Sequence, residues 1–530
     1  MESGRVSSDS QALIVFPLTG GMDSTSSPSV VPPGFFTVVE NGEYVVGRAP
    51  EPQFSVKKRL GTNKYNSVGI TGTPAITSMA EFWRHGASLS PTQKFVACAG
   101  DMILKDDLDG TWDTLLASGF GSSTTESNIT IAQGYAIFSN AGNQAPRLWD
   151  QTTLTTLGGS PPNFTASVYH LRRLWSVGDP AAPSRTQYTA AGDIADWSGA
   201  DTGNIIFDED DGDRLVGVSQ PYQGRLYFFK GPNKGTIHEI GGTTPSTFTR
   251  RTLVTSIPCV SHGGIVTTDS DIFWPSRYGI HSMSATQKYG DIEPAYISWP
   301  IQGTYNNLNH ARLNQIRGFY QPTRNVMGWL APSGSNTQND TMLVYNFAAK
   351  AWSVYKFSGF KGASVMVAQT PTTRVARLYV GGYAGFAFSG DQPTLSDFDA
   401  TQGYTLKVQS PYHMKMSDQV GPLHEKQYEA LTTFIRPTGD YTADISLSVD
   451  GRTQSDTIDL VAEGAVIGTF VIGTDKIGSA AATRYIERPI EDRGRGIQVE
   501  WRQSGANQDM EILGYAIRYA PGETFALEAS

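Results

Sequence analysis

The sequence contains few cysteines and no long hydrophobic run. Cys98 and Cys259 are the only cysteines in 530 residues, and each lies in an apolar, strand-like segment. A disulfide framework or a cysteine zinc site is therefore not expected, and we interpret both residues as small buried hydrophobes. No segment approaches the roughly 18 consecutive apolar residues of a membrane span, and no basic region precedes the short run Leu13–Leu18. We expect neither a membrane span nor an ordinary secretion signal.

Charge is also scarce. Asp, Glu, Lys and Arg make up 17% of the chain, and the net charge is −9, whereas a typical globular domain is about 25% charged. The basic residues form no stripe along the sequence. Tight binding along a nucleic-acid phosphate backbone is therefore not the expected chemistry.

Glycine and aromatic residues are abundant instead. The chain has 56 Gly, and Phe, Trp and Tyr together make up 11% of it. This composition argues against coiled coils, which are rich in Ala, Glu, Lys, Leu and Arg, and the apolar content argues against disorder. Many short strands joined by tight turns are the expected result, and the sequence predicts an all-β chain.

A hairpin pattern recurs between residues 76 and 395. An apolar strand, a Gly-containing turn and a second strand ending in an aromatic residue repeat at intervals of roughly 40 to 50 residues, which is the length of one four-stranded propeller blade. A hairpin cannot bury its own face, so these units must pack around a common axis. We predict a β-propeller of six or seven blades over residues 76–395.

The two ends of the chain differ from this repeat. Residues 1–75 are rich in Gly and Pro and predict an extended N-terminal arm. Residues 396–530 contain longer alternating strands, in which Ile445, Leu447 and Val449 share one face. Such half-buried antiparallel strands predict a C-terminal β-sandwich or platform module.

Catalytic and nucleotide-binding signatures are missing from the sequence. It has no Walker A loop, no GxGxxG and no GxSxG motif. The segment His424–Tyr428 resembles the start of a zincin helix, but Tyr428 stands where a second His is needed, and the flanks favour a strand. We expect no enzyme activity, no catalytic residues, no cofactor and no metal-binding residues.

Two acidic turns leave alternatives open. The cluster Asp208–Asp213 holds five carboxylates, which could supply oxygen ligands to calcium or form a solvated turn before the next strand. The spacing does not fit an EF-hand loop. The segment Lys105–Trp112 is similar to the Asp-box turn of sialidase-like propellers, which is a structural element, although its Asp109–Gly110 spacing is one residue short.

A cluster of basic and aromatic residues at His170–Trp175 could contact nucleic acid. If the segment is a strand, Leu171, Arg173 and Trp175 lie on one face and Arg172 and Leu174 on the other. We then expect the arginine stems to pack on the sheet with their charged ends in water.

The order of segments along the chain resembles the tail nozzle, or tail hub, proteins of short-tailed bacteriophages. The segments that carry the resemblance are Pro33–Arg48, Phe95–Leu115, Gly212–Gly242, Ile272–Ile297, Arg484–Gln503 and Met510–Ala520. The resemblance covers most of the chain, except residues 1–30.

The resemblance implies a structural virion protein with no catalytic residues. It implies a homohexameric ring in the phage tail, assembled in the host cytoplasm, that continues the DNA-ejection channel. The expected partners are further copies of the chain, tail adaptor proteins, and tail fibres or spikes, while DNA passes without sequence-specific binding. A protein-interaction propeller or a carbohydrate-active propeller unrelated to phage is the alternative.

Overall fold

A computed structural model describes residues 12–47, 54–85, 91–121, 126–140, 144–284, 296–370, 373–399, 401–417, 420–460 and 484–524. The chain forms two compact units. Unit 1 comprises residues 1–61, 345–356 and 393–530, and unit 2 comprises residues 62–344 and 357–392. The division expected from the sequence, an extended arm over residues 1–75, a propeller over 76–395 and a C-terminal module over 396–530, stays a prediction. Residues 285–295, within one of the segments that carry the resemblance, lie outside the described residues.

Unit 2 is built from antiparallel sheets of three or four strands, nearly all consecutive in the chain. The first three are β6 (Ile76–His85), β7 (Pro91–Ala99), β8 (Met102–Asp106) and β9 (Asp113–Leu116); β10 (Ser127–Ala132), β11 (Tyr135–Asn140), β12 (Arg147–Trp149) and β13 (Leu154–Thr156); and β14 (Ala166–His170), β15 (Arg173–Val177), β16 (Arg185–Tyr188) and β17 (Gly203–Ile206). The next two are β18 (Arg214–Val218), β19 (Leu226–Gly231), β20 (Ile237–Gly241) and β21 (Thr249–Val254); and β22 (Val266–Thr267), β23 (Ile272–Pro275) and β24 (Ile280–Ser282).

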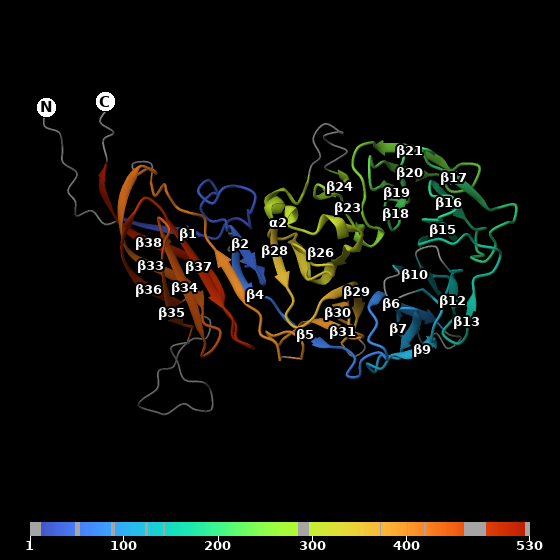
Figure 1. Cartoon of the computed structure of the whole chain (residues 1–530), viewed down its shortest axis with the longest axis horizontal. Helices are drawn as coiled ribbons and strands as arrows, with labels where there is room; N and C mark the ends of the chain where they lie inside the picture. The colour runs from blue at the N-terminus through green and yellow to red at the C-terminus, as the bar shows by residue number, and fades with distance from the viewer. Residues whose placement is uncertain are drawn as a thin grey trace. The chain divides into compact units, whose positions relative to one another are not determined.

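The last sheets of unit 2 close a ring. One contains β25 (Arg317–Gln321), β26 (Val326–Ala331) and β27 (Thr341–Asn346), and the other joins β29 (Gly362–Gln369), β30 (Ala376–Gly382) and β31 (Ala387–Gln392) to β5 (Gly61–Lys64) from much earlier in the chain. The first strands contact one another in a closed series, β6–β10–β14–β18, then the 3-10 turn η1 (His262–Gly264), β25, β29 and back to β6. Figure 1 shows these sheets around a common centre. Unit 2 is therefore β-propeller-like.

Apolar clusters between neighbouring sheets hold this ring together. The cluster between the sheets that begin with β6 and β10 includes Phe82, Phe138 and Trp149, each at most 1% exposed. The rings of Phe82 and Trp149 meet edge to face with centroids 5.7 Å apart. Because a hairpin exposes both faces when alone, burial between sheets supplies the main stabilisation of each one.

Unit 1 contains two sheets. Sheet A has the strand order β3-β4-β38-β33-β36, with β1 also paired to β38. Its strands are β1 (Ala12–Pro17), β3 (Gly42–Val46), β4 (Phe54–Lys58), β33 (His424–Arg436), β36 (Arg484–Gly494) and β38 (Glu511–Thr524). Sheet B has the order β28-β2-β32-β37-β34-β35. Its strands are β2 (Val38–Glu40), β28 (Ala351–Lys356), β32 (Leu406–Gln409), β34 (Thr442–Val449), β35 (Arg452–Asp459) and β37 (Ile497–Gln503).

The inner faces of sheets A and B pack against each other. Trp501 of β37 is fully buried; its Nε1 donates to Thr433 Oγ1 of β33 at 3.1 Å, and its ring lies 5.0 Å from that of Tyr515 in β38. On β34, Ile445, Leu447 and Val449 are at most 7% exposed, which confirms the predicted buried face. Alternation of apolar and polar residues positions this core because successive side chains of a strand point to opposite faces.

Helical structure is confined to short turns in the described residues. They include α2 (Gln302–Asn306) and the 3-10 turns η1, η3 (Trp299–Ile301), η4 (His310–Gln315) and η5 (Pro322–Arg324). None of the described helices has the length and apolar character needed to cross a membrane. Cys98 and Cys259 are both buried and unpaired, as expected.

Candidate functional site

The acidic cluster Asp208–Asp213 forms a turn around a buried lysine. Lys230 of β19 has no exposed surface, and its Nζ donates to the carbonyl oxygens of Phe207 at 3.0 Å and Asp208 at 2.7 Å. The same Nζ lies 2.7 Å from Asp211 Oδ2. A lysine ammonium thus occupies the position among these oxygens where a bound cation would lie.

Two further carboxylates of the cluster, those of Asp213 and Asp208, also have partners within the protein. Asp213 accepts backbone N–H groups of Asn233, Lys234 and Gly235 at 2.7 to 2.9 Å. Asp208 lies 3.2 Å from Arg250. In the described residues, no group of three or more His, Cys, Asp or Glu side chains is placed to hold a metal. Of the two interpretations of this cluster, the turn matches its geometry.

The other acidic turn caps a hairpin. It connects β8 and β9, where Asp106 Oδ1 accepts the N–H groups of Leu108 at 2.6 Å and Asp109 at 3.0 Å. Asp109 in turn accepts the N–H of Thr111 at 2.8 Å. These are local turn contacts, so the segment has the structural role expected of an Asp-box-like turn.

The basic and aromatic segment His170–Trp175 contains the turn of a hairpin and is not a single strand. Leu171 and Arg172 have φ angles of +50° and +61°, and His170 pairs with Arg173 across a two-residue hairpin turn. The expectation that the arginines keep their charged ends in water is wrong for Arg173, whose side chain is 4% exposed. The tight turn reverses the chain in the middle of the segment, so alternation cannot run through it.

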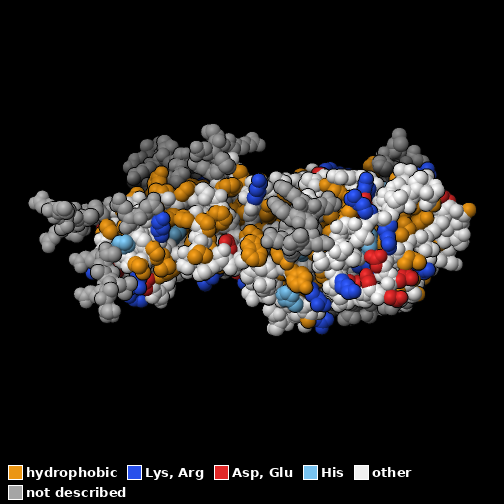
Figure 2. Space-filling view, turned by 90° about the horizontal axis from the view of Figure 1, so that it is seen from above, with side chains coloured by type: hydrophobic (Ala, Val, Ile, Leu, Met, Phe, Trp, Pro, Cys, Tyr) orange, Lys and Arg blue, Asp and Glu red, His pale blue; other side chains and the backbone are white. Residues whose placement is uncertain are grey.

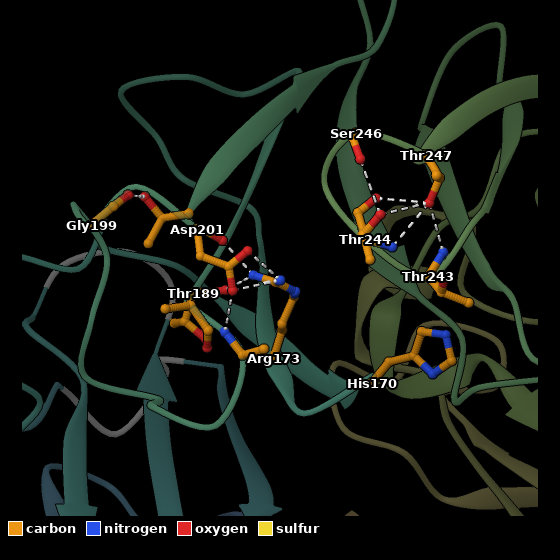
Figure 3. Close-up of polar contacts among 12 residues, drawn as sticks. His170, Arg173, Thr189, Gly199, Asp201, Thr243, Thr244, Ser246 and Thr247 are labelled. Carbon is orange, nitrogen blue, oxygen red and sulfur yellow. Dashed lines mark hydrogen bonds and ion pairs between the residues drawn. The ribbon is translucent and has the colours of Figure 1, made fainter.

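Arg173 makes an ion pair within unit 2. Its Nη2 lies 2.7 Å from both carboxylate oxygens of Asp201, and its Nη1 donates to the Thr189 carbonyl at 2.8 Å (Figure 3). The Asp201 carboxylate also accepts the N–H of Ala191 at 3.1 Å. The guanidinium therefore ties the loop that contains Asp201 to the sheet of β14–β17.

The segment His424–Tyr428, which resembles the start of a zincin helix in sequence, is not helical. His424 begins the long strand β33, as its flanks predicted. Tyr428 is fully buried in sheet A, and burial raises its pKa strongly.

The outer face of sheet A exposes apolar side chains. Val15, Ala516, Thr432 and Glu487 lie in register across β1, β38, β33 and β36, on the face opposite the buried Phe16. The next row on this face contains Pro17, Gly514, Phe434 and Tyr485, and the rings of Phe434 and Tyr485 are 5.3 Å apart. Leu13, Val15 and Tyr485 are 58%, 51% and 69% exposed. Figure 2 shows apolar side chains on the visible surface of unit 1, at the left of the view.

Strand β1 adds an open edge to this face. In the described residues it pairs with β38 alone, and its sequence Ala12–Pro17 contains no charged residue. Edge strands of soluble proteins are usually shielded by charges, bulges or a covering segment, because unpaired backbone groups can pair with another chain. We call β1 and the exposed side chains Leu13, Val15 and Tyr485 the sheet A surface.

Sequence reasoning had not identified the sheet A surface. In the sequence, Leu13–Leu18 is only a short apolar run. Its alternation of exposed Leu13 and Val15 with the buried Phe16 follows from pairing with β38, roughly 500 residues later. The signal that could have found it is an uncharged alternating strand.

No protein-family model and no curated protein matches the chain. Among solved structures, the chain is similar to a quinonprotein alcohol dehydrogenase-like protein from Bacteroides thetaiotaomicron, with 12% sequence identity and a TM-score of 0.36. The similarity covers 59% of this chain and 75% of the other.

Proposed function

We propose that this protein is a structural component of the tail of a short-tailed bacteriophage. In this proposal, copies of the chain form a homohexameric tail nozzle that continues the DNA-ejection channel and anchors neighbouring tail components. The order of sequence segments that resembles nozzle proteins supports it, as does a surface suited to permanent assembly. The chain has no enzymatic role in this proposal.

The sheet A surface carries the proposal. Leu13 and Val15 are each more than half exposed on an uncharged edge strand, and Tyr485 adds a largely exposed aromatic ring. Tyrosine is among the side chains that are enriched in protein interfaces and at their hot spots. A ring requires heterologous contacts, in which this surface meets a different surface of the next copy.

The proposal takes unit 2 as a complete seven-bladed propeller. Six separate sheets lie in this unit, and β25–β27 supply a seventh. Pairing of β5 with β31 would close the ring between its first and last blades. Propellers leave only short, protected strand edges, which suits a rigid body that many partners contact.

The weak charge of the chain is compatible with a DNA conduit. At a net charge of −9, the protein has no excess of cations that would hold passing DNA by counterion release. In this proposal the tail adaptor proteins and the fibres or spikes contact the ring, and the virion tail is its location.

The oligomeric state of a double variant tests the proposal. We expect Leu13→Asp with Val15→Asp to abolish ring formation, because both charges would be buried at the contact. Val375→Asp is the matched control, since Val375 is also 51% exposed but lies in unit 2. A ring that persists in the double variant would contradict a role for this surface.

A further inference from the structure

The ring of first strands in unit 2 surrounds a cavity. It has a volume of about 430 Å³ and is lined by the first residues of several strands, among them Ser127 of β10, Arg214 of β18 and Arg317 of β25. Because these strands contact one another in a closed series, their starting ends gather at one end of the ring. The volume lies within the range of roughly 300 to 1,000 Å³ that is usual for small-molecule sites. We call it the axial cavity.

An ion pair lies between the axial cavity and a second cavity. Glu126 and Arg317 line both the axial cavity and a neighbouring cavity of about 720 Å³. Arg317 Nη2 lies 3.1 Å from Glu126 Oε1. Arg317 Nη1 donates to Ser261 Oγ at 3.2 Å and to the carbonyl oxygen of Asn314 at 3.1 Å. The protein itself thus compensates the charge of Arg317.

Two other charged side chains, those of Asp179 and Arg214, line the axial cavity. Only Asp179 has a charge partner among the described residues. Asp179 accepts the N–H of Ala181 at 3.0 Å and lies 3.4 Å from Arg185. Arg214, in contrast, is exposed at the start of β18, and its guanidinium makes no hydrogen bond or ion pair with any described residue. Its five N–H donors can therefore pair with an anion that enters the cavity.

Neutral hydrogen-bond donors accompany Arg214. His262 Nδ1 accepts the N–H of Val218 at 3.4 Å, which leaves Nε2 to carry the hydrogen of the neutral ring. Burial, together with nearby Arg317, lowers the pKa of His262 to about 4, so the ring is neutral at physiological pH. Asn128 Oδ1 accepts the Thr130 hydroxyl at 3.3 Å, and the Asn128 amide nitrogen donates to no described residue.

We propose that the axial cavity binds a small molecule that carries an oxyanion, a carboxylate or a phosphate, with Arg214 as its charge partner. The planar guanidinium matches the two oxygens of such a group, and charge-assisted hydrogen bonds of this kind are the strong ones. His262 and Asn128 then bind further oxygen atoms of the ligand. Every residue that lines this cavity belongs to unit 2, whereas the sheet A surface belongs to unit 1.

Titration calorimetry at constant ionic strength tests this site, with succinate and inorganic phosphate as separate probes. We expect saturable one-to-one binding of at least one probe, and the probe that binds identifies the group. Arg214→Gln should weaken it about tenfold or more, since it removes a charged hydrogen-bond partner. Arg251→Gln is the control, because Arg251 is 65% exposed in the same unit and does not line the cavity.

A second variant should change the affinity for the probe in the opposite direction. Glu126→Gln removes the carboxylate that compensates Arg317, so it should tighten binding of the same probe. A misfolded protein cannot produce that gain. Failure of both probes to bind saturably would overturn the proposal, and so would equal affinities of the wild type and Arg214→Gln. Neither result bears on ring formation, which is measured separately.

Discussion

Arg59 and Asp397 form a doubly hydrogen-bonded ion pair inside unit 1. Arg59 Nη1 lies 3.0 Å from Asp397 Oδ1 and Nη2 lies 2.6 Å from Oδ2, with side chains 3% and 0% exposed. The same guanidinium donates to Asn41 Oδ1 at 3.0 Å and to the Lys356 carbonyl at 3.1 Å, and it stacks 3.7 Å from the Tyr404 ring. One side chain therefore connects the three chain segments from which unit 1 is assembled.

Removing one member of this pair should destabilise unit 1 strongly. We expect Arg59→Met to lower the free energy of unfolding by about 3–5 kcal/mol, because it leaves the Asp397 carboxylate buried without a cation. Denaturant unfolding measured by tryptophan fluorescence, with Trp501 buried in this unit, monitors the change. The double variant Arg59→Met with Asp397→Leu should lose less of the free energy of unfolding than Arg59→Met alone, because no buried carboxylate remains. If Arg59→Met and the double variant lose the same free energy of unfolding, the ion pair is not the source of the loss.

Lys230 should stabilise the turn that its ammonium fills. Lys230→Met leaves the Asp211 carboxylate and the carbonyls of Phe207 and Asp208 without their donor, which should cost about 1–3 kcal/mol. Thermal unfolding of the two proteins measures the difference. Lys234→Met serves as the control, because Lys234 is exposed on the adjacent turn. A control variant as unstable as Lys230→Met would contradict the role assigned to Lys230.

The same geometry predicts that calcium has no effect on stability. The Lys230 ammonium already lies among the oxygens of Phe207, Asp208 and Asp211, and a second cation there would be repelled. We expect the unfolding midpoint of the wild type to be the same in millimolar calcium and in chelator. A rise in the midpoint with calcium would show that the acidic cluster binds the ion elsewhere.

Acid should destabilise the protein through its buried histidines. His413 in unit 1 stacks on Phe16 and lies 2.6 Å from the Tyr515 hydroxyl, and burial lowers its pKa to about 4. In the unfolded chain the same group titrates near 6.5. Between these values the unfolded state binds more protons, so the free energy of unfolding falls as pH falls from about 6.5 to 4. The slope per histidine reaches about 1.4 kcal/mol per pH unit.

Two histidine variants separate this effect from general acid denaturation. His413→Gln should show a smaller loss of unfolding midpoint between pH 7 and pH 5 than the wild type. His310→Gln, at an exposed position, should keep the slope of the wild type. Identical pH slopes in all three proteins would contradict the assignment to His413.

Local patterns in the sequence predicted much of the strand structure. The alternation at Ile445, Leu447 and Val449 identified the inner face of β34, since period-two burial depends only on neighbouring residues. The recurring hairpins likewise predicted consecutive antiparallel strands. In contrast, His170–Trp175 was misread, because a two-residue turn at Leu171 and Arg172 lacks the usual Gly or Asn.

Long-range pairing could not be predicted from the sequence. Nothing local to Val15 specifies Ala516 as its neighbour, and nothing near Thr62 specifies β31 as the partner of β5. The same holds for the charge partners of Arg59 and Lys230, which lie 338 and 19 residues away along the chain. Pairings of this kind depend on the packing of the complete fold.

The mass of the assembled protein, measured in solution and checked by electron microscopy of the same particles, tests the central claim most directly. Our account predicts closed rings of six copies, with a mass six times the 57.4 kDa of one chain. It also predicts that Leu13→Asp with Val15→Asp yields folded single chains. A wild-type protein that stays monomeric at the highest concentration measured would contradict the account.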